Sequence, residues 1–396
     1  MNTTINSNTF NANVSIARLI TNRRDATSNP LYNTVRCTFD ENNMVVESNN
    51  INSSIRIDIP AEEIGMSTVE NGSILLTEPV LSWLSRVEGD LSITSEEAEI
   101  SLKTGDDHFE LNMKSQDYQN NIFRELRTPD ASCSSFTVPA KHFLAALQFC
   151  AVNACPNEQQ TSCIAFHADE DVLNMYSYGE RATKASSVKI KMDKKLSFKK
   201  IADASSLGKV CRGFASYTQA HNIDTLTIYV DDRGIWFEAD GIRMYTQGSQ
   251  IQLPDWSLLE KRFSWGDFVD VSHGAFSRAV SNVNSVSDKS RLKMAFSENS
   301  VKVYSSAVDE NKVESHVPYF MGSSLPKNHE KSVVLASFVE LINSLPPSNG
   351  NIRICFEKAD NGQLPICVEY GPMKSVVMVQ SRYGFVVFVS KESGSV

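Results

Sequence analysis

The sequence predicts an α+β protein built from three similar segments of about 130 residues, each with two helix-plus-antiparallel-sheet halves. Three observations lead to this prediction. A helix pattern followed by a strand, an acidic turn and more strands occurs near residues 10, 135 and 270. Each segment contains a second unit of the same kind. A repeat of this length is the size of a domain and too long for a solenoid unit.

The helices are predicted from apolar side chains that recur at helical spacing. The first is expected at 10–24, in the stretch FNANVSIARLITNRR. The second is marked by apolar residues at i, i+1, i+4 and i+7, which are Val80, Leu81, Leu84 and Val87. Its ends are indicated by a cap position, a first-turn acid and a terminal glycine, which are Thr77, Glu78 and Gly89.

The later segments repeat this apolar stripe. It occurs at Phe143, Leu144, Leu147 and Cys150, at Phe276, Ala279, Val280 and Val283, and at Phe338, Leu341, Ile342 and Leu345. Pro346 and Pro347 end the last of these helices. The remaining helix is expected to open the stretch 197–221, ahead of the strands of its half.

The strands are predicted from alternation of apolar and polar residues. Two β-rich runs flank the turn Asp231-Asp232-Arg233-Gly234, which is typical of a hairpin. The residues that share one face are Leu226, Ile228 and Val230 in the first run and Ile235, Phe237 and Ala239 in the second.

Bulk properties indicate a soluble cytoplasmic protein of several domains. The 396 residues contain no apolar run of the ~20 residues that a membrane-spanning helix needs. The N-terminal stretch MNTTINSNTF has no signal-peptide pattern. We expect it to be a short arm, either disordered or adding a strand. The eight cysteines form no CxxC pair, and Cys150 and Cys155 lie closest together, so buried reduced thiols are expected.

The charge of −9 argues against a strong nucleic-acid binder if it is read alone. Net charge, however, does not fix where the charges lie. The basic residues gather in and near the predicted helices: Arg18, Arg23, Arg24, Arg86, Lys141, Lys199, Lys200, Lys209, Arg212, Arg278, Lys289 and Arg291. The acidic residues gather in predicted turns, as at 40–41, 96–97, 106–107, 169–171, 231–232 and 309–310. A shared helix surface would therefore be positive and the sheet-and-turn rim negative.

No catalytic arrangement appears in the sequence. The seven histidines show no HExxH or metal-ligand spacing, and there is no GxGxxG, P-loop or GxSxG motif. Paired acids such as Asp106-Asp107 lie in turn-like sequence, where solvated turns are more common than acid–base pairs. We therefore expect no enzymatic activity, no cofactor and no metal.

Five short motifs, in this order and spacing, resemble the bacterial DNA polymerase III β subunit, the sliding-clamp family. They lie at 29–33 (NPLYN), 136–140 (FTVPA), 177–182 (SYGERA), 253–256 (LPDW) and 376–378 (VVM). The resemblance covers roughly residues 10 to 383. It implies three DNA-clamp domains, at 1–130, 131–262 and 263–396, that form half of a ring closed by a second, head-to-tail protomer.

The resemblance also implies partners. These are double-stranded DNA bound without sequence preference, and a DNA polymerase and a clamp-loader ATPase that bind through short peptides. The residues expected to line or approach the DNA channel are Arg23, Arg24, Lys199, Lys200, Lys209, Arg212, Arg278 and Lys289. The residues matching the family's partner-peptide pocket are Thr161, Ser177, Gly179, Arg181, Ala182, Pro254, Leu258, Leu259, Val376, Val377 and Met378.

The chain departs from the family pattern in this pocket. The family's His and Leu are replaced by Glu180 and Ala182, and its Pro-Met-Arg-Leu ending is replaced by residues 379–383. Residues 384–390, GFVVFVS, extend the third segment and have the composition of a further strand. We therefore expect a divergent clamp, one that serves a dedicated polymerase or is encoded by a phage or mobile element.

Two other functions fit the repeat pattern. One is a ring-forming structural or assembly protein that never encircles DNA, for which uncharged or acidic inner helices are expected. The other is a clamp-mimicking interaction protein that binds polymerase-associated proteins, for which a monomer or a blocked channel is expected.

Overall fold

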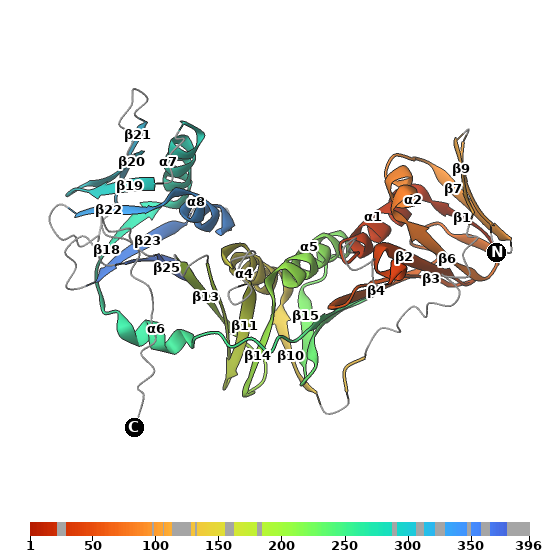
Figure 1. Ribbon diagram of the computed structural model, residues 1–396, viewed down its shortest axis with the longest axis horizontal. Coiled ribbons are helices and arrows are strands. Elements are labelled where there is room, and N and C mark those ends of the chain that lie inside the picture. The colour runs from red at the N-terminus through yellow and green to blue at the C-terminus, as the bar shows by residue number, and fades with distance from the viewer. Residues whose placement is uncertain are drawn as a thin grey trace. The chain divides into compact units, whose positions relative to one another are not determined.

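A computed structural model places most of the chain in two compact units (Figure 1). The first contains Met1–Leu144 and Ser206–Gly248, and the second contains Ala145–Ser205 and Ser249–Val396. The residues described are 1–21, 29–96, 99–105, 107–112, 128–130, 133–154, 162–179, 184–286, 291–305, 313–320, 329–346, 350–357 and 365–377.

The first unit contains two antiparallel sheets. The five-stranded sheet runs β5 (Ser67–Glu70), β1 (Asn2–Asn6), β7 (Asp90–Glu96), β8 (Glu99–Thr104) and β9 (Asp107–Asn112). The eight-stranded sheet runs β10 (Ser134–Pro139), β15 (Thr225–Val230), β16 (Gly234–Ala239), β17 (Ile242–Gln247), β4 (Ser53–Pro60), β3 (Asn43–Asn49), β2 (Thr34–Phe39) and β6 (Gly72–Thr77). The helical elements here are α1 (Ser7–Arg18), η2 (Pro30–Asn33), α2 (Glu78–Leu84), most of α5 (Ala204–His221) and the start of α4 (Ala140–Asn153).

The second unit also contains two antiparallel sheets. The eight-stranded sheet runs β14 (Phe198–Asp203), β11 (Cys163–Asp169), β12 (Val172–Tyr178), β13 (Lys184–Lys191), β25 (Met373–Val377), β24 (Ile366–Tyr370), β23 (Asn351–Glu357) and β18 (Trp265–Ser272). The four-stranded sheet runs β21 (Glu314–Pro318), β20 (Ser300–Ser305), β19 (Arg291–Phe296) and β22 (His329–Val334). Its remaining helices are α6 (Trp256–Arg262), α7 (His273–Val286) and α8 (Leu335–Ser344).

The N-terminal arm forms an inner strand. β1 pairs with β5 on one side and with β7 on the other, so of the two expectations for this arm the strand is confirmed. The Asn6 side chain then caps α1 by accepting hydrogen bonds from the backbone N–H groups of Asn8 and Thr9. Strand and helix therefore meet without a loop between them.

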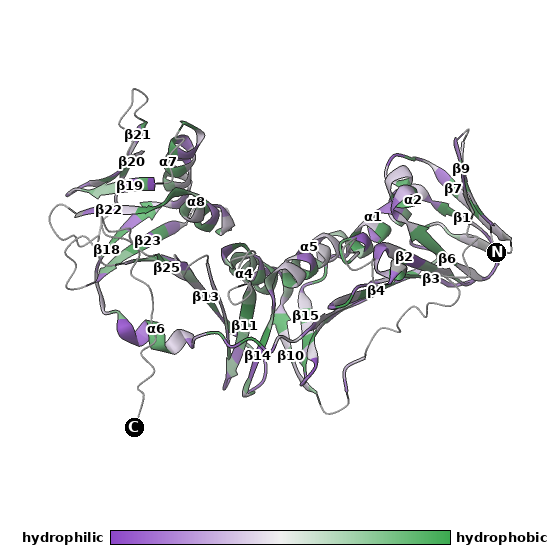
Figure 2. Cartoon of the chain, in the orientation of Figure 1, coloured by the Kyte–Doolittle hydropathy of each residue, from purple (hydrophilic) through white to green (hydrophobic). Residues whose placement is uncertain are grey.

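The apolar stripes predicted from the sequence are the buried faces of the helices. Phe143 of α4 and Phe214 of α5 both pack on Phe237 of β16, with ring centroids 6.0 and 6.4 Å away. Leu226 and Ile228 of β15 are fully buried, as the predicted alternation requires. Hydrophobic residues occupy much of the strands on which the helices pack (Figure 2). The predicted α+β fold with antiparallel sheets is confirmed.

Two details of the predicted order are wrong. The stretch 197–221 does not open with a helix, because residues 198–203 form strand β14 and α5 begins only at Ala204. Helix α6 is not predicted from the sequence, because its apolar residues Trp256, Leu258 and Leu259 fall within one turn and show no repeated stripe. Its N-cap was readable in the sequence: Asp255 accepts a hydrogen bond from the Ser257 N–H.

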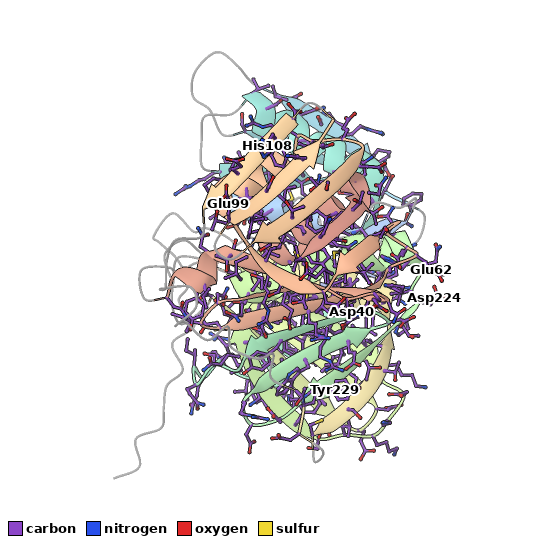
Figure 3. All side chains as sticks on the ribbon, turned by 90° about the vertical axis from the view of Figure 1, so that its right-hand side faces the viewer. Asp40, Glu62, Glu99, His108, Asp224 and Tyr229 are labelled. Atoms are coloured by element: carbon purple, nitrogen blue, oxygen red, sulfur yellow. The ribbon has the colours of Figure 1, made fainter. Side chains whose placement is uncertain are left out.

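The predicted acidic turns at 40–41 and 231–232 are formed, whereas those at 96–97, 106–107 and 309–310 lie partly or wholly outside the described residues. The Asp40 carboxylate accepts from the N–H groups of Asn42 and Asn43, and that of Asp231 accepts from Arg233 and Gly234. Short carboxylates stabilise turns in this way because they bond their own backbone two residues on. Figure 3 shows exposed acids of the first unit at turns and strand ends, namely Asp40, Glu62, Glu99 and Asp224.

Replacing the α1 cap tests how far the joint between β1 and α1 stabilises the first unit. Asn6→Ala leaves two backbone N–H groups of α1 without their acceptor and is expected to destabilise the first unit by about 1 kcal/mol. Urea unfolding and amide hydrogen exchange of residues 7–18 measure the change. Asn8→Ala, inside the helix, is the matched control, and equal effects of the two substitutions would contradict the capping role.

Candidate functional site

One row of side chains crosses six strands on a single face of the second unit's eight-stranded sheet. The strand registers set these residues directly opposite one another, from β12 to β18: Tyr178, Ala185, Val376, Cys367, Cys355 and Phe268. All except Phe268 are buried. We call these six residues the apolar row.

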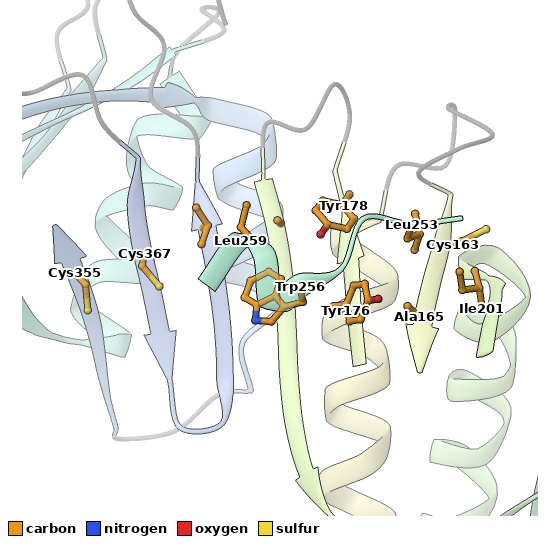
Figure 4. Packing of buried hydrophobic residues seen from close by; sticks show 12 residues of the cluster. Cys163, Ala165, Tyr176, Tyr178, Ile201, Leu253, Trp256, Leu259, Cys355 and Cys367 are labelled. Atoms are coloured by element: carbon orange, nitrogen blue, oxygen red, sulfur yellow. The ribbon is translucent and has the colours of Figure 1, made fainter. Parts of the chain in front are cut away.

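Helix α6 covers the apolar row. Trp256 and Leu259 are 1 % and 7 % exposed and belong to the same hydrophobic cluster as Tyr178 and Val376 (Figure 4). The segment before α6 is fastened to the sheet, because the Tyr178 hydroxyl donates to the Pro254 carbonyl at 3.1 Å. Two successive elements, the 249–255 segment and α6, are therefore held against this face.

The cover leaves an apolar rim. Leu258 of α6 is 65 % exposed although its neighbour Leu259 is buried, and Pro254 is exposed at the start of the helix. A Leu side chain held in water on a rigid helix is a contact point for another apolar group. We call this rim, together with the apolar row that α6 covers beneath it, the candidate groove, and Leu258 and Pro254 are its exposed residues.

Burial raises the pKa values of cysteine and tyrosine side chains in and beside the apolar row. It raises the pKa of Cys355 to about 12, with a smaller contribution from Glu369, and it raises the pKa values of Tyr176 and Tyr178 above their usual range. These groups are therefore neutral at physiological pH, and the apolar row carries no charge.

The end of the groove at β14 is polar. Burial alone would raise the pKa of Asp255, but the hydrogen bonds from Ser257 and the nearby Lys199 and His167 bring it below its ordinary value. The capping carboxylate of α6 is thus ionised, as a helix N-terminus favours.

The structure separates the residues predicted for the peptide pocket. Pro254, Leu258, Leu259 and Val376 lie on the α6 face. Val377 and Ser177 point to the opposite face, because residues alternate along a strand. There the Ser177 hydroxyl donates to the Cys150 carbonyl of α4 at 2.8 Å. The other predicted positions, Thr161, Arg181, Ala182 and Met378, lie outside the described residues, and Gly179 directly follows β12.

The residues predicted to contact DNA also divide. Arg212 of α5 and Arg278 of α7 are exposed, and Lys209 of α5 is half-buried. Lys199 and Lys200 lie on strand β14, not with the helices, and Lys199 is close to Asp255 at the groove end. Arg23, Arg24 and Lys289 lie outside the described residues.

The helices carry the charge pattern expected from the sequence. The chain has a net charge of −9. The six α-helices of the described residues other than α6 nevertheless contain five Lys or Arg residues and only two acids. The acids are Glu78 and Glu340, and both form ion pairs, with Arg18 and Lys184. The exposed residues between the charges are small and uncharged, for example Ala12, Ser15, Ala215, Ser216, Ser281 and Asn282.

The equivalent sheet of the first unit has no such groove. A row that again crosses six strands, from β15 to β2, contains Thr227, Glu238, Arg243, Arg56, Glu47 and Arg36. Its charges pair along the row: Glu238 accepts from Arg243 at 2.9 Å, and Glu47 accepts from both Arg36 and Arg56. This row of the first unit is therefore charged at the positions where the row of the second unit is apolar.

The described residues lack two other kinds of feature, a metal-ligand group and a membrane-spanning helix. They contain no group of three or more His, Cys, Asp or Glu residues placed to hold a metal ion. None of their helices is long and apolar enough to cross a membrane.

Comparison with known proteins identifies the fold. No family model and no curated protein matches the chain. Solved structures do. The Bacillus subtilis DNA polymerase sliding clamp has a TM-score of 0.78 at 15 % identity and covers 97 % of this chain and 100 % of its own. The Thermotoga maritima DNA polymerase III β subunit has a TM-score of 0.76 at 12 % identity, covering 96 % and 99 %.

A third structure is that of a clamp with a bound peptide. The Helicobacter pylori β clamp bound to a DNA ligase peptide matches with a TM-score of 0.76 at 13 % identity, covering 96 % of this chain and 100 % of that one. The chain therefore has the DNA sliding-clamp fold of the bacterial polymerase III β subunits. The resemblance inferred from the short motifs is confirmed at the level of the fold.

The reactivity of the cysteines tests whether α6 seals the apolar row. Burial raises the pKa of Cys355 to about 12, so at pH 8 only on the order of 10⁻⁴ of it is thiolate, the reactive form. Iodoacetamide should therefore modify half-buried Cys133 well before Cys355 and Cys367, as followed by peptide mass mapping of the folded protein. Equal rates at Cys133 and Cys355 would show that α6 does not cover the row.

Proposed function

We propose that this protein is a DNA sliding clamp, a processivity factor that encircles duplex DNA and tethers a polymerase to it. The observation that carries the proposal is the match to clamp folds over 96–97 % of the chain. It is supported by the charge of the described helices other than α6, which is net positive in an acidic protein. A net positive helix set also counts against an assembly ring, for which uncharged or acidic inner helices are expected.

In this proposal the chain forms three domains, at 1–130, 131–262 and 263–396, and two chains close head to tail into a ring. The free edges of the two smaller sheets, β9 in the first unit and β21 or β22 in the second, suit such closure, because an edge strand can pair with a strand of another chain. The helices then face the channel.

Topology holds such a ring on DNA, so the contacts themselves can be weak. Arg212, Arg278, Lys209 and Lys141 on the helices would meet phosphates, which carry no sequence information. The exposed residues between them are small, so few side chains would reach the base edges in the grooves. Contacts that are alike at every position let the ring slide.

Partners would bind at the candidate groove. Leu258 and Pro254 provide the apolar rim for Leu or Phe side chains, and the packing of Trp256 and Leu259 on the sheet holds this rim in place. Met378, Arg181, Ala182 and Thr161 belong to the same proposed pocket. A weak peptide is enough, because tethering raises the local concentration of polymerase at the template. Loading would need a separate ATPase, and the chain itself is proposed to have no enzymatic activity, cofactor or membrane partner, and to act in the cytoplasm.

The function is tested by oligomeric state and DNA retention. Light scattering after size exclusion should give a dimer, and the protein should stay on closed circular DNA but slide off when the DNA is linearised. Neutralising Arg212 or Arg278 should weaken duplex binding equally for all sequences and lower the salt slope by about one unit each. A stable monomer that shows no difference between circular and linear DNA favours the clamp-mimicking interaction protein instead.

The groove is tested by charging its rim. Leu258→Asp should weaken binding of a Leu- and Phe-containing polymerase peptide about tenfold or more, because the carboxylate must lose water against an apolar partner. Ser257→Asp adds the same charge to α6 at the neighbouring exposed position and serves as the control. Fluorescence polarisation reads both. Unchanged affinity in Leu258→Asp places the peptide site elsewhere, whatever the DNA assays show.

A further inference from the structure

A nearly buried lysine joins two elements of the second unit. Lys184, the first residue of β13, has a side chain that is only 3 % exposed. Its ammonium donates to the Ser337 carbonyl of α8 at 3.2 Å and to the Glu340 carboxylate at 3.0 Å. An ammonium group withdrawn from water is costly unless charge and hydrogen bonds replace the water, and here both do.

The path of this side chain explains a glycine. A Cβ atom on Gly179 would lie 2.6 Å from Cγ of Lys184 and 3.1 Å from its Cε, which is closer than carbon atoms pack. The Gly179 N–H also donates to the Lys184 carbonyl at 2.9 Å. The glycine is therefore required where the lysine passes along the sheet toward α8. Lys184 is paired with Val377, so it lies on the face opposite the candidate groove.

Glu340, the partner of this lysine, lies on the surface of α8. Its side chain is 57 % exposed, while Phe338 and Leu341 of the same helix are buried. The described α-helices other than α6 contain two acidic residues, and Glu340 is one of them. The other, Glu78, is largely buried and paired with Arg18. Glu340 is thus the acid most open to a ligand on this helix set.

We propose that Lys184 promotes DNA binding without touching DNA, by neutralising Glu340 on the helix surface that faces the duplex. The proposal rests on the function proposed above, which places α8 at the channel. A bare carboxylate there would repel the phosphate backbone over about a Debye length. The lysine, on the sheet face beneath α8, cancels this charge and leaves the surface free of a long basic side chain.

Three variants separate this charge effect from a structural one. Lys184→Met keeps an unbranched side chain of similar length under Gly179 but removes the ammonium. Glu340→Gln removes the acid and keeps an oxygen that can accept from Lys184. The double variant Lys184→Met with Glu340→Gln removes both charges. Lys195→Met is the matched control, since Lys195 pairs with Glu170 at 2.7 Å with both side chains exposed in a turn.

The readout is binding of a short fluorescein-labelled DNA duplex at low and moderate salt, with thermal unfolding recorded for each variant. Lys184→Met should weaken duplex binding about two- to fivefold at low salt, the size expected for one unscreened charge near phosphates. Glu340→Gln should bind at least as well as the wild-type protein. The double variant should recover wild-type affinity, and Lys195→Met should show no loss.

The outcomes are distinguishable. If the wild-type protein does not bind duplex, the proposed function fails. If the wild-type protein binds and Lys184→Met binds equally well, the charge proposal alone fails. If Lys184→Met weakens binding and Glu340→Gln does not rescue it, the lysine acts by holding β13 to α8, and the proposal is again overturned. Rescue in the double variant, with peptide affinity unchanged throughout, supports it.

Discussion

The pairing of β13 with β25 is the constraint on which the second unit depends. These strands are almost 190 positions apart in the chain, and their register sets Ala185 opposite Val376 and Lys184 opposite Val377. Because residues alternate between faces, this single register places Ala185 and Val376 on the face that α6 covers. It places Lys184 and Val377 on the opposite face, toward α8. A slip by one residue would bring an ammonium group into the apolar row and an alanine toward α8.

Local periodicity was enough to predict most of the elements. The stripes at Val80 and Leu84 or at Phe338 and Leu341 became buried helix faces, and the hairpin at 231–234 formed as expected. Two elements of the second unit escaped this reasoning. Helix α6 has seven residues, and its presence is signalled only by the capping Asp255. Strand β14 reads as part of a helix in the sequence, because Phe198, Ile201 and Ala202 lie at i, i+3 and i+4.

The candidate groove was predicted only in part for a different reason. Adjacent residues in a sequence motif, such as Val376-Val377, are predicted to line the same pocket. In a strand, however, adjacent side chains point to opposite faces. Residues far apart, such as Tyr178, Cys355 and Phe268, become neighbours only through strand pairing, which no local pattern encodes. The charge pattern was more accessible. Clustering of Lys and Arg on helices can be read directly, whereas the pairing of Lys184 with Glu340 requires the fold.

The two eight-stranded sheets show how one architecture limits where a partner can bind. In each, a row of six residues crosses six strands on one face. In the first unit the row is charged, and its carboxylates and guanidinium groups are already paired, so an apolar peptide would have to displace water from these ion pairs without replacing their hydrogen bonds. In the second unit the row is neutral and closed by Trp256 and Leu259, with Leu258 left in water at its edge. Desolvation thus opposes an apolar peptide on the first sheet and favours one on the second. Among the described residues, two structurally similar sheets thereby leave one proposed partner site, in the second unit.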